Sequence, residues 1–144
     1  MTASASMDLL INIDVNDVER GIAFYGAAFG LTVGRRFGED GVELLGAQAP
    51  IYLLRKAAGT RAAATSGALR DYARHWTPLH LDIVVADVDA AVARAVQAGA
   101  VLEQAAQKHA WGRIALLADP FGHGFCLLQF VGRGYDEVAT GGSH

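Results

Sequence analysis

The 144-residue sequence holds a single cysteine, Cys126, so no disulfide can form within the chain. A fold that depends on disulfides is therefore excluded, and a reducing cytoplasm is the expected compartment. Basic stripes are also missing: the net charge is −3, with 12 lysine and arginine residues against 15 acidic ones. This charge balance disfavours a nucleic-acid partner.

Long apolar runs and an export signal are likewise not seen in the sequence. The longest apolar stretch falls far short of the roughly 20 residues that cross a bilayer, so we expect no membrane partner. The opening MTASASMDLL has no basic segment leading into an apolar one, which predicts a chain that is not exported. With 52% hydrophobic and 19% charged residues, the chain can bury one compact domain or two half-domains that share a core.

One pattern is present twice, about 70 residues apart. LLINIDVNDVERGI at 9–22 and LHLDIVVADVDAAV at 79–92 are both apolar runs that end in Val-x-Asp-Val and lead into a helical pattern. In each copy alternate residues are apolar, as in a strand with one buried face. Asn16-Asp17 and Asp87 are placed to cap the helices that follow, and a glycine is placed to end each helix.

Three further strands are expected after each helix. They are predicted at 31–37, 41–47 and 51–57 in the first copy, and at 100–106, 112–118 and 124–130 in the second. Both copies thus have the order βαβββ, which indicates a duplicated half-domain. The predicted boundaries are a flexible start at 1–7, modules at 8–57 and 77–131, a linker at 58–76 with room for a short helix at 68–74, and a flexible tail at 132–144.

One βαβββ module has a single helix, which covers one face of its strands and leaves the other face bare. Two modules therefore predict an α+β fold: a curved mixed sheet with its helices outside and its bare faces around a groove. By alternation, Asn12 and Asp82 lie on the groove side of central strands, where we expect them to contact a ligand or solvent. Tyr52, Phe37 and Trp111 are aromatic candidates for the groove walls.

The chain resembles the vicinal oxygen chelate superfamily, which includes the glyoxalase, bleomycin-resistance and extradiol dioxygenase relatives. The resemblance covers about residues 8–131 and rests on VNDVERGIAFYGAAFGLTV, VADVDAAVARAVQAGA and WGRIALLADPFGHGFCLLQF. The Asp-Val that opens each helix and the Asp119-Pro120-x-Gly122 turn are specific for the fold. The resemblance implies a glyoxalase/bleomycin resistance-like fold and a homodimer, whereas the fold does not by itself fix a reaction.

Metal-dependent members of this superfamily place His, Gln or Glu ligands at four strand positions that face the cavity. The resemblance assigns these positions to Leu10, Tyr52, His80 and Cys126. Of the four, only His80 is a conventional ligand of the family, because leucine cannot bind a cation and a neutral tyrosine binds one poorly. Cys126 could bind as a thiolate, but His80 and Cys126 alone make a thin site. The prediction is therefore no cofactor, with a divalent metal held partly by His80 as the alternative.

The predicted ligand-binding residues share a position on the groove face or at its mouth, and no residue is assigned a catalytic role. They are Asn12, Tyr52, His80, Asp82, Trp111 and Cys126. For His80 three roles stay open: a hydrogen bond to Asp82 or Tyr52, a ligand-contacting or acid–base role, and a metal ligand. Cys126 is interpreted first as a small buried hydrophobic residue, and second as a nucleophile or redox group.

Two classes of function follow, with a third behind them. The first is a small-molecule-binding protein of the bleomycin-resistance type, which holds an apolar or aromatic compound without a complete metal site; acidic groove residues would suit an amine on that compound. The second is a metal-dependent lyase, isomerase or dioxygenase with His80 as one ligand, and the third is a metal-free enzyme with His80 as general base. A homodimer is expected, with the linker at Tyr72–Trp76 contributing to its interface.

Overall fold

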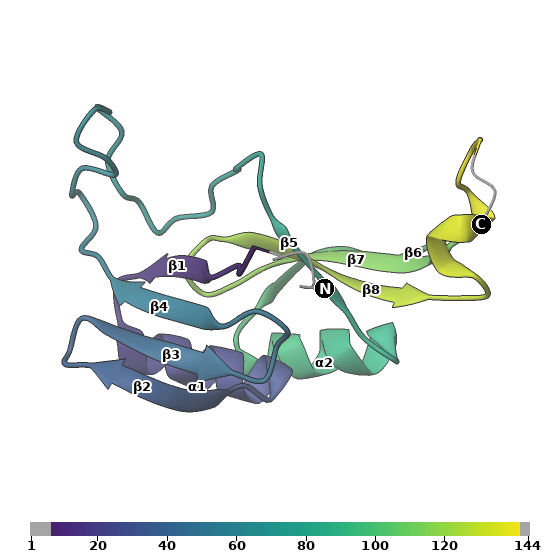
Figure 1. Ribbon diagram of the computed structural model, residues 1–144, viewed down its shortest axis with the longest axis horizontal. Helices are drawn as coiled ribbons and strands as arrows, with labels where there is room; N and C mark the ends of the chain where they lie inside the picture. Colours follow the sequence, from purple (N-terminus) through teal and green to yellow (C-terminus); the bar gives the residue numbers. More distant parts are fainter. Residues whose placement is uncertain (1–6, 142–144) are drawn as a thin grey trace, which may run out of the picture. The chain divides into compact units, whose positions relative to one another are not determined.

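The computed structural model describes residues 7–141, and the chain divides into two compact units (Figure 1). The first unit runs to Gly26 and resumes at Gly30–Arg70; the second comprises Ala27–Phe29 and the chain from Asp71 onward. Each sheet belongs to one βαβββ module, so the predicted α+β fold of two such modules is confirmed. Residues 1–6 and 142–144, in the two segments predicted to be flexible, lie outside the described residues.

The first module is a four-stranded mixed sheet with one helix. Its elements are β1 (Ile11–Val15), α1 (Val18–Phe29), β2 (Thr32–Phe37), β3 (Gly41–Leu45) and β4 (Ile51–Arg55). The strand order is β1-β4-β3-β2, with β1 parallel to β4 and the other neighbours antiparallel. Asp17 caps α1 by accepting a hydrogen bond from the N–H of Arg20, and Gly30 ends it in the left-handed conformation, as the sequence predicts.

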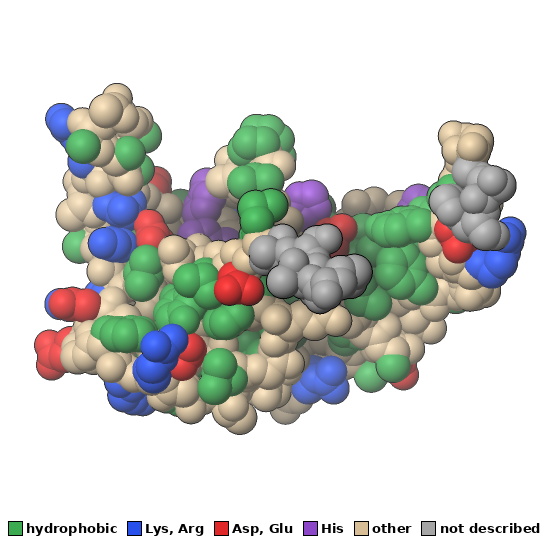
Figure 2. Space-filling view, in the orientation of Figure 1, with side chains coloured by type: hydrophobic (Ala, Val, Ile, Leu, Met, Phe, Trp, Pro, Cys, Tyr) green, Lys and Arg blue, Asp and Glu red, His purple; other side chains and the backbone are tan. Residues whose placement is uncertain are grey.

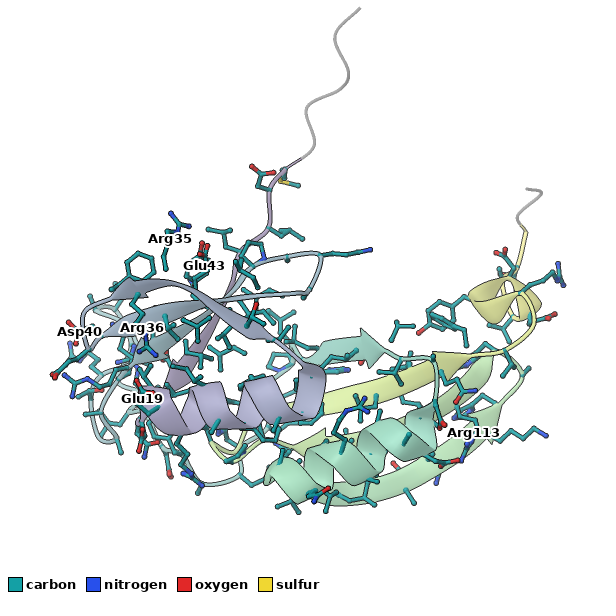
Figure 3. The ribbon with its side chains drawn as sticks, turned by 90° about the horizontal axis from the view of Figure 1, so that it is seen from below. Glu19, Arg35, Arg36, Asp40, Glu43 and Arg113 are labelled. Carbon is teal, nitrogen blue, oxygen red and sulfur yellow. The ribbon has the colours of Figure 1, made fainter. Side chains whose placement is uncertain are left out.

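Alternation decides which face of the first sheet carries the core. The buried apolar residues of β3 and β4 are Val42, Leu44, Ile51 and Leu53. On the same side an ion pair of 2.9 Å joins Arg36 Nη1 of β2 to Glu19 Oε1 of α1. Figure 3 shows this pair beside α1, whereas Arg35 and Glu43 lie on the other side of the sheet. That second side is the face that α1 leaves bare.

The second module repeats this arrangement. Its elements are β5 (Leu81–Val84), α2 (Val88–Ala98), β6 (Val101–His109), β7 (Gly112–Ala118) and β8 (Gly124–Phe130), followed by a 3-10 helix η1 (Gly134–Glu137). The strand order β5-β8-β7-β6 matches that of the first sheet. Asp87 caps α2, and Gln129 of β8 also accepts a hydrogen bond from the N–H of Val88. None of the helices in residues 7–141 has both the length and the apolar character needed to cross a bilayer.

The first strand of each module is shorter than the alternating pattern that predicts it. β5 begins at Leu81, so His80 precedes the strand. In the segment before it, the Thr77 hydroxyl donates to the Leu79 carbonyl. The prediction that Asn12 and Asp82 lie on central strands is wrong: within the described residues, β1 pairs with β4 alone and β5 with β8 alone. Parallel pairing with the last strand of its module places each of them at the edge of its own sheet.

The short helix allowed at 68–74 is not formed. Both backbone groups of Arg70 bond to an earlier part of the linker. Its N–H donates to the Thr60 carbonyl, and its carbonyl accepts from the N–H of Gly59. Its guanidinium donates to Asp14 Oδ2 at 2.8 Å. Further on, a Cβ on Gly122 would lie 2.2 Å from the Ala73 carbonyl oxygen, so this part of the linker rests closely on the β7–β8 turn. These contacts replace the internal hydrogen bonds of a helix.

Candidate functional site

A row of polar side chains crosses the bare face of the first sheet. Asn12 of β1 is in register with Tyr52 of β4, which is in register with Glu43 of β3. Opposite Glu43, β2 forms a β-bulge, because Val33 and Arg36 pair regularly while Gly34 and Arg35 together face one residue. We call Asn12, Tyr52 and Glu43 the first row.

Glu43 is the centre of a hydrogen-bond network in this row. Its Oε1 accepts from the backbone N–H of Arg35 at 3.0 Å and from Arg35 Nε at 3.1 Å. Its Oε2 accepts from Arg35 Nη2 at 2.8 Å and from the Tyr52 hydroxyl at 3.0 Å. These donors, led by the Arg35 side chain, lower the pKa of Glu43 to about 2. The carboxylate is therefore ionised at neutral pH and has no role as a proton donor there.

The β-bulge is shaped to admit this carboxylate. A Cβ on Gly34 would lie 2.5 Å from Glu43 Oε1, so a side chain at this position would displace the acid. Bulges commonly re-aim a side chain, and this one turns Arg35 onto the bare face while Arg36 points to α1. The arrangement leaves Glu43 only 7% exposed, whereas the Arg35 side chain is 67% exposed. The buried Glu43 carboxylate thus fixes the largely exposed guanidinium of Arg35.

Phe37 extends the network into an aromatic surface. Its ring centroid is 6.2 Å from that of Tyr52, and the Arg35 guanidinium carbon lies 5.9 Å from the centre of the Phe37 ring. The Phe37 side chain remains 46% exposed. We call Arg35, Phe37, Glu43 and Tyr52 the Arg35 platform.

The second sheet carries a corresponding row. Asp82 of β5 is in register with Cys126 of β8, which is in register with Leu116 of β7; these three residues are the second row. The row lies on the face away from α2, because Arg113 and Gln129, which contact α2, have the opposite alternation. Cys126 holds the register position in this sheet that Tyr52 holds in the first.

His80 joins the second row from outside the strand. Its Nε2 lies 3.0 Å from Asp82 Oδ1, so of the two partners considered for His80, Asp82 is the one it contacts. One donor atom from each of His80, Asp82 and Cys126 lies within 4.8 Å of the others. Both His80 and Asp82 are substantially exposed, which is not the dry setting that tunes a general base.

The Cys126 thiol is held in its protonated form. Burial, followed by the nearby Asp82 carboxylate, raises its pKa to about 11. A thiol of this kind is a weak nucleophile at neutral pH, because the thiolate is the reactive species. The interpretation of Cys126 as a small buried residue agrees with this setting better than the nucleophilic one.

Trp111 lies apart from the second row. Gly112, next to Trp111, pairs with Phe130, four residues along β8 from Cys126. The Trp111 ring is stacked on His109 at 5.2 Å and lies 5.2 Å from the Tyr135 ring of η1, so part of the predicted tail packs on this end of the sheet. Figure 2 shows hydrophobic side chains gathered here, beside the C-terminal segment.

A separate hollow of about 460 Å³ opens at the N-terminal end of α1. Most of the residues that line it are charged or polar: Asn16, Asp17, Glu19, Arg36, Glu39 and Arg55, together with Val18 and Gly38. None of the predicted ligand-binding residues belongs to this set, and Arg36 is already paired with Glu19. The hollow is therefore distinct from both rows.

The structure thus brings together two sets of predicted site residues: Asn12 with Tyr52, and His80 with Asp82 and Cys126. Arg35 and Glu43 were not predicted. The available signal was the lone acid in the apolar run GVELLGA, which an alternation argument places beside an aromatic strand neighbour.

A family model described as a glyoxalase-like domain matches residues 10–128. The chain belongs to the glyoxalase-like family. Its predicted membership of the vicinal oxygen chelate superfamily is thereby confirmed. The Asp-Val helix openings and the Asp119-Pro120 turn, on which that prediction rested, lie inside the matched region.

Relatives of this glyoxalase-like chain include an anthracycline biosynthesis protein, DauV, of Streptomyces sp. (strain C5). The two are 32% identical over 138 residues, which cover 92% of this chain and 44% of DauV. The chain spans between 29% and 44% of the length of the curated relatives that it matches.

Solved structures show the same fold. A glyoxalase/bleomycin resistance protein/dioxygenase family enzyme from Burkholderia phytofirmans PsJN is 20% identical with a TM-score of 0.67, covering 85% of this chain and 97% of its own. The fosfomycin resistance protein FosX from Listeria monocytogenes is 17% identical with a TM-score of 0.67, covering 96% and 100%. At such identities the likeness concerns the fold alone.

The ligand positions of metal-dependent superfamily members do not form a complete set in this chain. Leu10 has no donor atom, and the Tyr52 hydroxyl already accepts from Arg35 Nη2 at 3.0 Å and donates to Glu43. The second row with His80 offers nitrogen, carboxylate and sulfur donors, which suit a zinc-type cation better than a hard one. The four-position pattern therefore does not fit, whereas a three-donor set within the second module does.

Proposed function

We propose that this glyoxalase-like protein binds a small, flat, apolar or aromatic molecule on the bare face of its first sheet, without a complete metal site. The observation that carries the proposal is the exposed ring of Phe37 beside Tyr52 and a fixed guanidinium. Small-molecule sites combine aromatic surface with a few well-placed polar groups, and the Arg35 platform supplies both.

Exposure of Phe37 is informative because burial would stabilise the protein. Fully burying a phenylalanine side chain contributes about 1.5–3 kcal/mol, and almost half of this side chain is left uncovered. A flat ligand lying on the ring would realise this contribution on binding. The relative DauV supports an aromatic ligand, since anthracyclines are polycyclic aromatic compounds.

The test is a thermal-shift titration with naphthylmethanol, a neutral aromatic probe. A ligand that binds only the native state at 100 times its Kd adds about 2.7 kcal/mol to stability, so the wild-type Tm should rise. Phe37→Ala should reduce the shift, whereas Val33→Ala, an exposed apolar position of the same strand on the α1 side, should keep it. No shift in the wild type, or an equal loss in both variants, would contradict the proposal.

A metal-dependent activity is the second candidate, and one observation favours it. His80, Asp82 and Cys126 could together hold a zinc-type cation, which would act as a Lewis acid on a substrate oxygen. Elemental analysis after mild purification decides between the candidates. The first expects well under one equivalent of metal; one equivalent that is lost in both His80→Ala and Cys126→Ser would favour the second.

We also propose a homodimer in the cytoplasm. The unpaired thiol of Cys126 suits a reducing compartment. Within residues 7–141, β6 pairs only with β7 and so offers an open edge, and Trp76 is 78% exposed. Tyr72 packs on Phe121 of its own unit, which leaves Trp76 as the linker residue best placed to anchor an interface.

Light scattering at micromolar concentration tests the dimer. The expected result is twice the chain mass, with dissociation favoured in Trp76→Ala. A wild-type monomer at that concentration would refute the dimer while leaving the ligand proposal intact.

A further inference from the structure

We infer that the Arg35 platform recognises an anionic oxygen on its ligand, so that the ligand class is a planar aromatic carboxylate or phenolate. The inference rests on the proposed function and names the chemistry of the ligand. It reverses the expectation of an amine, which came from the acidic residues of the sequence.

The first step concerns the donors that Arg35 has in use. Nε and Nη2 donate to Glu43, and Nη2 also donates to the Tyr52 hydroxyl. A guanidinium has five N–H donors, two of them on Nη1. Among residues 7–141 no acceptor engages Nη1, and the side chain that carries it is largely exposed. Two donors are thus presented to solvent from a guanidinium whose other edge is fixed.

The second step concerns competing charge on this face of the first sheet. Glu43 is occupied by Arg35 and Tyr52, and Asp14 of β1 is paired with Arg70 at 2.8 Å. Asn12, the remaining polar member of the first row, is uncharged. An incoming cation would find both carboxylates of these strands already paired, whereas an incoming oxyanion would find free donors on Arg35.

The third step concerns shape. A guanidinium is planar. Glu43 occupies its parallel Nε–H and Nη2–H groups, so a ligand oxygen would meet the remaining N–H groups of Nη1. The guanidinium lies beside the Phe37 ring, which in turn neighbours Tyr52. A ligand oxygen at Nη1 therefore brings an attached flat ring next to exposed aromatic surface. An oxyanion is preferred over a neutral carbonyl because it adds Coulomb attraction to the positively charged guanidinium.

The hydrogen bonds to Glu43 stabilise its ionised form, but fold stability alone does not require the Arg35 side chain to be both fixed and largely exposed. Fixing an arginine side chain costs rotamer entropy. Here the guanidinium of Arg35 is fixed by the buried Glu43, by the β-bulge, and by Gly34, which leaves room for the Glu43 carboxylate. A guanidinium that is fixed before the ligand arrives loses less entropy on binding, which is the advantage of a preorganised site.

The experiment compares three probes with one ring system by calorimetric titration: naphthoate, naphthylmethanol and naphthylmethylammonium. The wild type should bind naphthoate more tightly than the neutral probe by roughly tenfold, as one charge-assisted hydrogen bond implies, and the cation most weakly. Equal binding of all three would overturn the inference and leave the proposed function standing. Binding of none would overturn both, and a preference for the cation would restore the expectation of an amine.

Arg35→Gln and Arg36→Gln form a matched pair of variants. The two arginines are adjacent on β2, each pairs with one glutamate, and they point to opposite faces. Arg35→Gln should remove the preference for naphthoate, whereas Arg36→Gln should keep it. Equal loss in both would show a general charge effect and would overturn the inference.

Glu43→Gln tests whether Glu43 positions Arg35. Removal of a negative charge beside the site raises affinity for an anion if charge alone matters. Loss of the anchor lowers affinity if the fixed orientation of Arg35 matters, and we expect this lower affinity for naphthoate, with the neutral probe unchanged. A higher affinity for naphthoate would overturn the positioning role.

Discussion

The two modules repeat one backbone and differ in the chemistry of its bare face. At the same register position, β3 carries Glu43 and β7 carries Leu116. The bulge opposite that position holds Gly34–Arg35 in the first sheet and Glu103–Gln104 in the second. In the first module Arg35 of the bulge donates hydrogen bonds to Glu43. In the second the row residue is apolar, and Glu103 instead pairs with Arg74 of the linker, with Nη2 and Oε1 2.9 Å apart.

This comparison shows how a duplicated fold can acquire two different surfaces. Strand pairing and bulge position are shared, so equivalent side chains occupy equivalent places. The polar network of the first row centres on Glu43, which accepts from Arg35 and Tyr52, whereas Leu116 at the equivalent position has no acceptor. The second module instead brings His80, Asp82 and Cys126 together at the edge of its sheet.

The largest expected effect tests whether the two cores are equivalent. Leu53 pairs with Ile13 and Leu127 pairs with Ile83, and both leucines are fully buried. Leu53→Ala and Leu127→Ala should each lower the free energy of unfolding by about 2–5 kcal/mol. Urea unfolding measures both. A far smaller loss for one of them would show that the two cores are packed differently despite their matching register.

The next effect concerns the acid that only the first row contains. The folded-state pKa of Glu43, about 2, lies below its ordinary value of 4.5, so its contribution to stability is complete above that value and is lost as the pH falls toward 2. Glu43→Gln removes this contribution. The stability difference between wild type and variant, from urea unfolding, should be largest at neutral pH and shrink through this window. A difference independent of pH would argue against the network.

The helix caps offer a comparison of smaller size. Asp17 accepts from the N–H of Arg20 at 3.0 Å, and Asp87 accepts from the N–H of Ala90 at 3.1 Å. Replacing either by alanine should cost about 1 kcal/mol. The loss should be smaller for Asp87, because Gln129 also accepts from the first turn of α2. Chemical unfolding of both variants gives the values, and a larger loss at Asp87 would contradict the role of Gln129.

The smallest expected change in stability is that of Asp82→Asn, which should nevertheless alter the rate at which Cys126 is alkylated. The neighbouring Asp82 carboxylate helps to raise the pKa of Cys126, so Asp82→Asn should lower that pKa and speed alkylation by iodoacetamide. The experiment uses protein dialysed against a chelator, with Asp89→Asn of α2 as the control. Labelling of the wild type should rise only as the pH approaches about 11. An unchanged rate in Asp82→Asn would mean that burial alone protects the thiol.

Much of the fold was predictable because local chemistry encodes it. The ends of α1 and α2 follow from Asp17, Gly30, Asp87 and Gly99, and the bounds of β7 and β8 follow from alternation and turns. The first strands are shorter than their alternating patterns, since pairing partners rather than alternation decide where a strand begins. The linker helix failed because helix propensity at 68–74 competes with contacts to residues far away in the sequence.

The sequence by itself determined the duplication, the helix ends, the alternation of the strands and the incomplete ligand pattern, of which Leu10 is the plainest member. Each of these depends on residues that are near one another in the chain. Only the tertiary structure decided that Arg35 meets Glu43 and that Cys126 lies beside Asp82. The reason is register: which side chains face each other across two strands depends on pairing and on a single inserted bulge residue, and these are settled only when distant segments come together.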